Sequence, residues 1–78
     1  MSVRSQIVEL FEEVAREQQR KLAPLSDGMK LLSTGLDSLS FALIVVRLEE
    51  SLGYNPFIDS ERFPVTFGDF VRLYERQP

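Results

Sequence analysis

The side chain with the clearest chemical potential is the hydroxyl of Ser38, in the stretch from Thr34 to Leu39. Within this stretch, Gly35 permits unusual backbone angles, and Asp37 is suited to cap the helix that the following apolar residues predict. This order leaves a serine hydroxyl in solvent beside a helix N-terminus, where partial positive charge favours anions. The pattern predicts that Ser38 is an attachment point and that the rest of the chain is the scaffold that presents it.

The composition argues against enzymatic chemistry by this chain alone. The 78 residues include no histidine and no cysteine. The chain therefore lacks the usual general base, the commonest metal ligand and any thiolate or disulfide. We expect no catalytic residue and no metal site. We also expect a single domain over residues 1–78, because so short a chain has too little core for two.

The charge distribution indicates the kind of partner to expect. The net charge of −3 argues against nucleic acid, which requires a basic face. From Asp37 to Glu61 the sequence contains five acidic residues and a single basic one, Arg47. A partner should therefore bring positive charge to this region. The N-terminus has no signal-peptide pattern, and the apolar run from Phe41 to Val46 is too short to span a bilayer. We expect a monomeric, cytoplasmic protein that does not bind membranes.

Hydrophobic periodicity predicts a first helix over residues 3–20 with a charged opposite face. Ser2 or Ser5 is a suitable cap at its start. Pro24 ends the pattern, and the long loop over residues 21–34 is expected to pack across the bundle and deliver the attachment serine. The apolar stripe of this helix comprises Val3, Ile7, Leu10, Phe11, Val14, Ala15 and Leu22.

Two further helices are predicted downstream. One runs from Ser38 to about Leu52, where Gly53 is a natural C-terminal cap, and the last begins after the capping residue Thr66. Between them, residues 58–63 have room for one short helical turn. The expected fold is an all-α bundle with three main helices, one short third helix and a long loop after the first helix. The buried stripe of the last helix comprises Phe67, Phe70, Val71 and Tyr74.

The helix that follows Ser38 carries two apolar stripes on nearly opposite sides. A small bundle buries only one stripe fully, so the one with larger side chains is expected in the core: Phe41, Ile44, Val45, Leu48 and Leu52. The other stripe, called the docking strip below, is expected to be partly exposed and to meet partners: Leu39, Ala42, Leu43 and Val46, followed by Glu49 and Glu50. The alternative is that the loop from Leu22 to Leu32 covers this strip.

The run Gly35-Leu36-Asp37-Ser38-Leu39 closely resembles the attachment motif of the acyl carrier protein family, G-x-D-S-L at the start of a helix. The resemblance covers nearly the whole chain. It implies a four-helix bundle in which Ser38 carries 4′-phosphopantetheine and is supported by Gly35, Asp37 and Leu39. Further matching residues are Leu31, Leu32, Leu48, Glu49 and Glu50, and the run from Thr66 to Phe70.

By this resemblance, a separate phosphopantetheinyl transferase that uses magnesium would move the group from coenzyme A to Ser38. The thiol of the arm would then carry acyl groups as thioesters. The cofactor would thus supply the thiol that this chain, which has no cysteine, lacks. The implied later partners are an acyl-loading ligase or transferase and acyl-processing enzymes of fatty acid, polyketide or other specialised acyl metabolism. A cargo pocket is expected between the second and third helices, near Phe41, Ile44, Val45 and Leu48.

Departures from the family pattern favour a specialised carrier over one of general fatty acid synthesis. Leu43 stands where many carriers of fatty acid synthesis have a glutamate, and Ser40 replaces a frequent aspartate. Ser33 lies where an acid is common, and Arg47 adds a positive charge. An aminoacyl or peptidyl carrier is an alternative, although those carriers typically have histidine in place of Asp37. The other alternative is an unmodified helical adaptor that binds proteins through the same strip.

Overall fold

The computed structural model describes residues 2–57 and 63–76. Along these residues the elements are α1 (Val3–Glu17), a 3-10 turn η1 (Leu31–Ser33), α2 (Ser38–Leu52) and α3 (Phe67–Glu75). Within the described ranges the chain is helical and forms no β-strand, apart from an isolated bridge between Lys30 and Thr66. The short helical turn expected at residues 58–63 falls, except for Phe63, outside the described residues.

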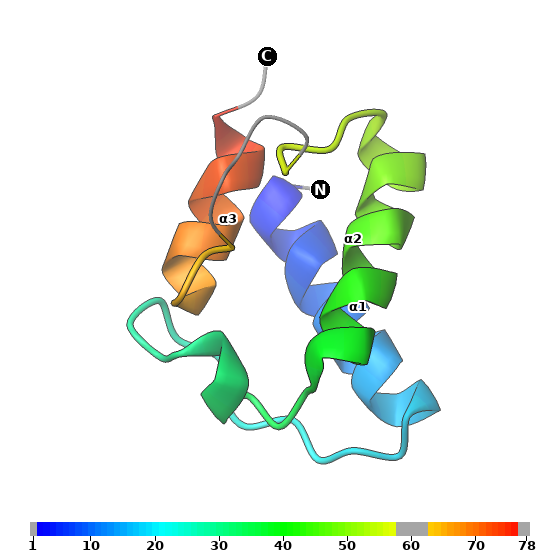
Figure 1. Cartoon of the computed structure of the whole chain (residues 1–78), viewed down its shortest axis with the longest axis vertical. Helices are drawn as coiled ribbons and strands as arrows, with labels where there is room; N and C mark the ends of the chain where they lie inside the picture. The colour runs from blue at the N-terminus through cyan, green and yellow to red at the C-terminus, as the bar shows by residue number, and fades with distance from the viewer. Residues whose placement is uncertain (1, 58–62, 77–78) are drawn as a thin grey trace.

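The helices form a small bundle in which α1 contacts both α2 and α3. Figure 1 shows α1 running antiparallel to the other two helices and lying behind them. The start of α1 and the end of α3 are at one end of the bundle, while the long loop between α1 and α2 closes the other end (Figure 1). This topology places the N-terminus of α2, and with it Ser38, at the loop end of the molecule.

The core contains an aromatic cluster to which all three helices contribute. The ring of Phe11 in α1 meets the ring of Phe67 edge to face at 5.2 Å and that of Phe70 at 5.6 Å, both from α3. The ring of Phe41 in α2 lies 6.1 Å from that of Phe11. Such aromatic pairs contribute about 0.5–1.5 kcal/mol each beyond the burial of their area. Phe11 of α1 thus connects the start of α2 with α3.

Helix α1 begins as expected and ends earlier than expected. The Ser2 hydroxyl caps it, accepting a hydrogen bond from the Ser5 N–H at 3.0 Å. The predicted end at residue 20 is wrong, because Gln19 adopts a left-handed conformation with φ of 55° and turns the chain. The Arg20 N–H then donates to the Ala15 carbonyl at 2.8 Å and the Gln19 N–H to the Arg16 carbonyl at 3.1 Å. This pairing is a Schellman ending in which glutamine occupies the position that glycine usually takes.

The long loop packs against the bundle and is tied to the start of α3. The Leu31 N–H donates to the Val65 carbonyl and the Phe67 N–H to the Met29 carbonyl, each at 2.9 Å. Leu31 is buried in the core, whereas its neighbour Leu32 is 80% exposed. The loop is therefore an ordered support for the residues that precede α2, with one large apolar side chain left in solvent.

The predicted bounds of α2 are confirmed at both ends. Asp37 caps its start, and Gly53 at its end has a φ of 84° and donates its N–H to the Glu49 carbonyl at 2.9 Å. Helix α3 begins after Thr66, as predicted, and the Thr66 hydroxyl accepts a hydrogen bond from the Asp69 N–H at 3.1 Å.

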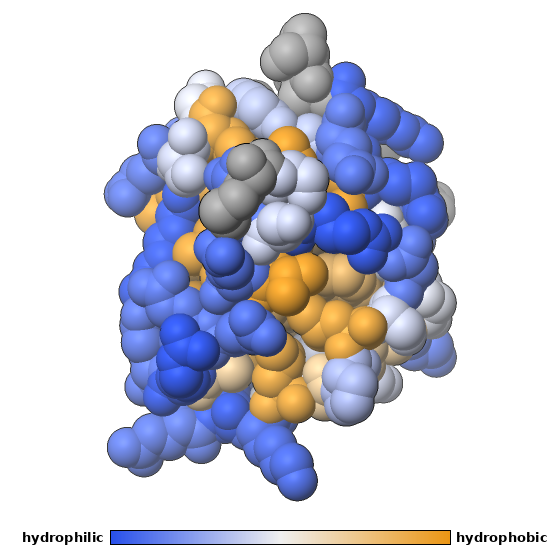
Figure 2. All heavy atoms as spheres, turned by 180° about the vertical axis from the view of Figure 1, so that it is seen from behind, coloured by the Kyte–Doolittle hydropathy of each residue, from blue (hydrophilic) through white to orange (hydrophobic). Residues whose placement is uncertain are grey.

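The rear face of the molecule is formed by α1 and part of the long loop. Figure 2 shows hydrophobic atoms on this face, surrounded by hydrophilic ones. A cavity of about 600 Å³ lies between α1 and the loop, and Val8, Leu22 and Leu25, all half-buried, are among the residues that line it. The loop thus covers α1 only in part. None of the described helices is both long enough and apolar enough to cross a membrane.

Candidate functional site

The N-terminus of α2 is organised by the carboxylate of Asp37. Its Oδ1 accepts hydrogen bonds from the Ser40 N–H and the Ser40 hydroxyl, each at 2.9 Å, and its Oδ2 accepts one from Arg20 at 2.7 Å. Ser40 is fully buried, so Asp37 satisfies a hydroxyl that would otherwise be unpaired in the interior. The hydrogen bonds from Ser40, together with the Arg20 guanidinium, lower the pKa of Asp37 below its ordinary value of 3.8.

Ser38 is the first residue of α2 and is exposed to solvent. Because Asp37 provides the cap, the serine hydroxyl is not needed for that purpose. Among the described residues, no hydrogen bond engages the Ser38 hydroxyl. The site therefore presents an unengaged hydroxyl beside a capped helix N-terminus, whose partial positive charge suits an attached phosphate.

The loop in front of Ser38 packs closely against neighbouring segments. Gly35 has a φ of 99°, and a Cβ atom placed on it would lie 2.4 Å from the carbonyl oxygen of Lys21. Thr34 is fully buried, and its hydroxyl donates to the Leu31 carbonyl at 2.6 Å. Leu36 is buried in the core. These contacts explain why glycine precedes the serine: the backbone there is both left-handed and in close contact with a neighbouring segment.

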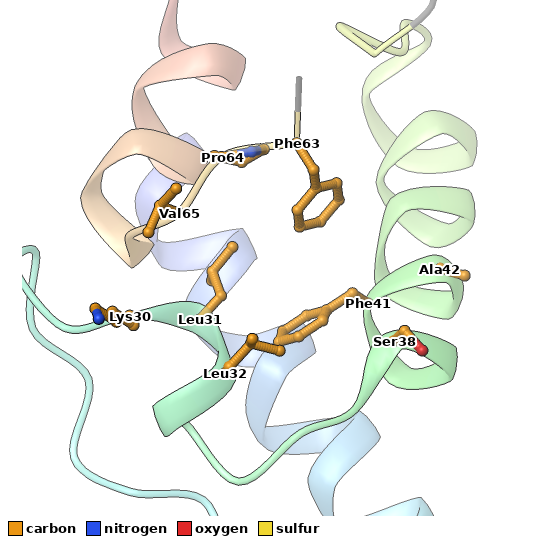
Figure 3. A pocket seen from close by; sticks show the side chains of 9 residues that line it. All are labelled: Lys30, Leu31, Leu32, Ser38, Phe41, Ala42, Phe63, Pro64 and Val65. Carbon is orange, nitrogen blue, oxygen red and sulfur yellow. The ribbon is translucent and has the colours of Figure 1, made fainter. Parts of the chain in front are cut away.

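An apolar groove of about 450 Å³ lies beside Ser38, between the start of α2, η1 and the segment before α3. Figure 3 shows the side chains of Leu32, Phe41 and Phe63 converging on it from these three segments, with Ser38 on the α2 side. Its lining is apolar except for Ser38 and Lys30. The full lining comprises Lys30, Leu31, Leu32, Ser38, Phe41, Ala42, Phe63, Pro64 and Val65.

The groove differs from the cargo pocket expected from the sequence. Of the four residues proposed for that pocket, only Phe41 lines the groove. Ile44 and Leu48 are fully buried in the core, and Val45 is half-buried against it. The open space thus lies closer to Ser38 than expected. Sequence reasoning missed the contributions of η1 and of residues 63–65, because no local periodicity relates these segments to α2.

The docking strip is uncovered along most of its length. Leu39 is 66% exposed and Val46 is 52% exposed. Ala42, Glu49 and Glu50 are also exposed. The long loop therefore leaves the strip open, which excludes the alternative that it covers the strip. The expected exposure of Leu43 is wrong, because this side chain is half-buried and packs against the core.

Arg47 binds α1 and does not add a free cation to the docking strip. Its guanidinium donates to both carboxylate oxygens of Glu17, at 2.6 and 2.9 Å, and lies 3.5 Å from a carboxylate oxygen of Glu13. The hydrogen bond from Arg47 lowers the pKa of Glu17 below its ordinary value of 4.5. Arg47 thus ties α2 to α1, and the net charge that the strip presents comes from Glu49 and Glu50.

In the part of the chain that the structure describes, no three carboxylate, histidine or cysteine side chains gather as a metal site. Comparison of the chain with models of protein families, with curated proteins and with solved structures finds no match. The functional assignment therefore depends on the geometry around Ser38 and on the sequence pattern that surrounds it.

Proposed function

We propose that this protein is an acyl carrier that receives 4′-phosphopantetheine from coenzyme A on Ser38. It carries acyl groups as thioesters on the thiol of that arm and presents them to partner enzymes in the cytoplasm. The proposal includes the four-helix architecture of the acyl carrier family. The chain itself is not an enzyme in this proposal, but a substrate of its transferase and its loading enzyme.

The observation that carries the proposal is the division of labour between Asp37 and Ser38. A serine at a helix start often occupies the N-cap position, where its hydroxyl is engaged by a backbone N–H. Here the aspartate caps the helix, and the hydroxyl of the next residue is exposed and unengaged. This arrangement leaves the Ser38 hydroxyl free for covalent attachment, and it supports a carrier over an unmodified adaptor together with the G-x-D-S-L pattern around it.

The residues present fit the attached group. In the transfer step, the Ser38 oxygen bonds to the phosphorus that bears pantetheine, the pyrophosphate bond of coenzyme A breaks, and adenosine 3′,5′-bisphosphate leaves. The hydroxyl proton passes to a base of the transferase, since the adjacent Asp37 carboxylate is already bound by Ser40 and Arg20. The N-terminus of α2 then stabilises the phosphodiester through its partial positive charge.

The groove supplies a place for the apolar part of the arm or its cargo. Ser38 lies on the wall of this groove, and most of its lining is hydrophobic. We place an acyl chain there rather than among Ile44 and Leu48, because those two side chains are fully buried in the packed core. The docking strip begins next to the serine at Leu39, so an enzyme bound to it has the arm within reach.

The test is the intact mass of the protein after incubation with coenzyme A, magnesium and a broad-specificity phosphopantetheinyl transferase. We expect a gain equal to one phosphopantetheine group, which Ser38→Ala abolishes. Ser33→Ala is the matched control, because it removes another exposed serine, at the end of η1, and leaves the Asp37 cap intact. A folded wild-type protein that gains no mass would overturn the proposal.

A further inference from the structure

The segment from Arg20 to Ala23, which follows α1, contacts the residues just before Ser38 at three points. The Ala23 N–H donates to the Thr34 carbonyl at 2.9 Å. The carbonyl of Lys21 lies against Gly35, where it leaves no room for a Cβ atom. The guanidinium of Arg20 donates to Oδ2 of Asp37 at 2.7 Å. The first two contacts involve backbone, so the Arg20–Asp37 pair is the contact that a side-chain substitution can remove selectively.

The position of Arg20 depends on an unusual backbone conformation. Gln19 has a φ of 55°, which residues with a Cβ atom adopt only at a cost, and it is the only non-glycine residue with positive φ in the described chain. The turn at Gln19 ends α1 and leads directly into Arg20, whose own N–H is fixed to the Ala15 carbonyl. The guanidinium thereby reaches a carboxylate 17 residues further along the chain.

The two oxygens of Asp37 have different partners. Oδ1 accepts from the Ser40 N–H and hydroxyl and forms the cap, while Oδ2 is held by Arg20. The carboxylate is thus oriented from two sides, by Ser40 within the first turn of α2 and by Arg20 from the segment after α1. Arg20 also balances a negative charge one residue from the hydroxyl that an anionic phosphate donor must approach.

We propose that Arg20 is a positioning residue for the modification of Ser38. It acts through Asp37: it fixes the capping carboxylate and balances its charge, so that the serine hydroxyl is presented in one geometry to the phosphate donor. This inference rests on the proposed function, because it concerns the rate at which the arm is attached.

The test compares the rates of phosphopantetheine transfer to wild-type protein, Arg20→Ala and Arg4→Ala. Arg4→Ala is the matched control, since Arg4 pairs with Asp27 at the same 2.7 Å with side chains 44% and 53% exposed, against 42% and 41% for Arg20 and Asp37. We expect Arg20→Ala to lower kcat about tenfold with little change in KM, as misplacement of a reacting group does. Arg4→Ala should react at the wild-type rate.

A second background separates an effect through Asp37 from direct contact with the transferase. Asp37→Asn retains a capping oxygen and removes the charge that Arg20 binds. In this background, Arg20→Ala should have no further effect on the rate. A second measurement does not involve the enzyme. Hydrogen exchange at the Ser40 amide should be faster in Arg20→Ala than in Arg4→Ala, because the Asp37 carboxylate that accepts its hydrogen bond loses the contact with Arg20.

The outcomes are distinguishable. If wild-type protein and Arg20→Ala react at equal rates, the inference is overturned and the proposed function stands. If Arg20→Ala slows the reaction equally in the Asp37→Asn background, Arg20 does not act through Asp37 and the inference is again overturned. If the wild-type protein is not modified at all, the proposed function fails and this inference fails with it.

Discussion

In the loop that precedes Ser38, the backbone at Gly35 leaves no room for a Cβ atom. Its φ of 99° is unfavourable for any residue with a Cβ atom, and the nearest backbone atom, the Lys21 oxygen, would lie 2.4 Å from that Cβ. Gly53 also has a positive φ, of 84°, but the space around it is open. Both glycines are left-handed, and of the two only Gly35 is in close contact with another segment.

We predict that Gly35→Ala destabilises the protein more than Gly53→Ala does. The left-handed conformation alone costs a residue with a Cβ atom about 1–2 kcal/mol, and the contact with Lys21 adds to this at Gly35. At about 4–8 °C per kcal/mol for a domain of this size, the melting temperature of Gly35→Ala should fall by about 10 °C or more. Gly28→Ala, which meets no atom within 4 Å, is the neutral control. Equal melting temperatures for all three variants would contradict this account of the loop.

At the scale of elements, three parts of the α2 surface differ in their surroundings. Its first turn presents Ser38, its inner stripe joins the aromatic core, and its outer stripe is the docking strip. Leu39 and Leu43 lie one turn apart, yet Leu39 is exposed and Leu43 is half-buried against the core. Charged substitutions at these two positions should therefore differ in their effect on stability.

We predict that Leu39→Glu leaves the melting temperature nearly unchanged and lowers the rate at which partner enzymes use the carrier. Leu43→Glu should reduce the free energy of unfolding by about 1–2 kcal/mol, because it places a carboxylate where apolar contacts are made. Thermal unfolding of both variants, followed by circular dichroism, checks the stability difference. A larger loss of stability for Leu39→Glu than for Leu43→Glu would show that the strip is misplaced on the helix.

The elements that the sequence predicts best are those with local signals at both ends. Helix α2 lies between a capping aspartate and a glycine, and its observed bounds are Ser38 and Leu52, as predicted. Helix α1 lacks such a signal at its end, because Gln19 replaces the usual glycine and nothing local marks the turn. The end of α1 is followed by tertiary contacts instead: Arg20 and Ala23 form hydrogen bonds with Asp37 and Thr34.

The parts of the candidate site that depend on local signals were also predictable. The cap and the exposed serine follow from neighbouring residues, whereas the groove is assembled from three segments that are distant in sequence. The partners of Arg20 and Arg47, 17 and 30 residues away, likewise depend on how the helices pack. The periodicity of α2 alone also placed Leu43 on the outer surface. It contains no information on how far the neighbouring elements extend around the helix, and these partly bury Leu43.

At the scale of the whole molecule, the pattern of ionisable groups determines how stability depends on pH. The hydrogen bond from Arg47 lowers the pKa of Glu17, those from Ser40 lower the pKa of Asp37, and that from Arg72 lowers the pKa of Asp69. Groups with a lowered pKa stabilise the fold when ionised, that is, above their ordinary values of 4.5 for glutamate and 3.8 for aspartate. This stabilisation is lost as the pH falls through the lower values in the folded state.

We therefore predict stability that is nearly constant between about pH 5.5 and 8 and falls below about pH 4. The flat region is expected because the chain has no histidine, the side chain that ordinarily titrates there. Each of the three carboxylates is solvent-accessible, so its contribution is small and decreases with added salt. Urea unfolding across this pH range measures the effect. A marked loss of stability between pH 7 and 6 would contradict the prediction.

The central claim is that Ser38 carries the phosphopantetheine arm. Tryptic digestion after modification yields a peptide from Leu31 to Arg47 that contains Ser33, Ser38 and Ser40. The most direct measurement is fragmentation of this peptide by mass spectrometry. Our account predicts one phosphopantetheine group on Ser38 and none on the other two serines. An unmodified peptide from a folded protein, or a group on Ser33 or Ser40, would contradict it.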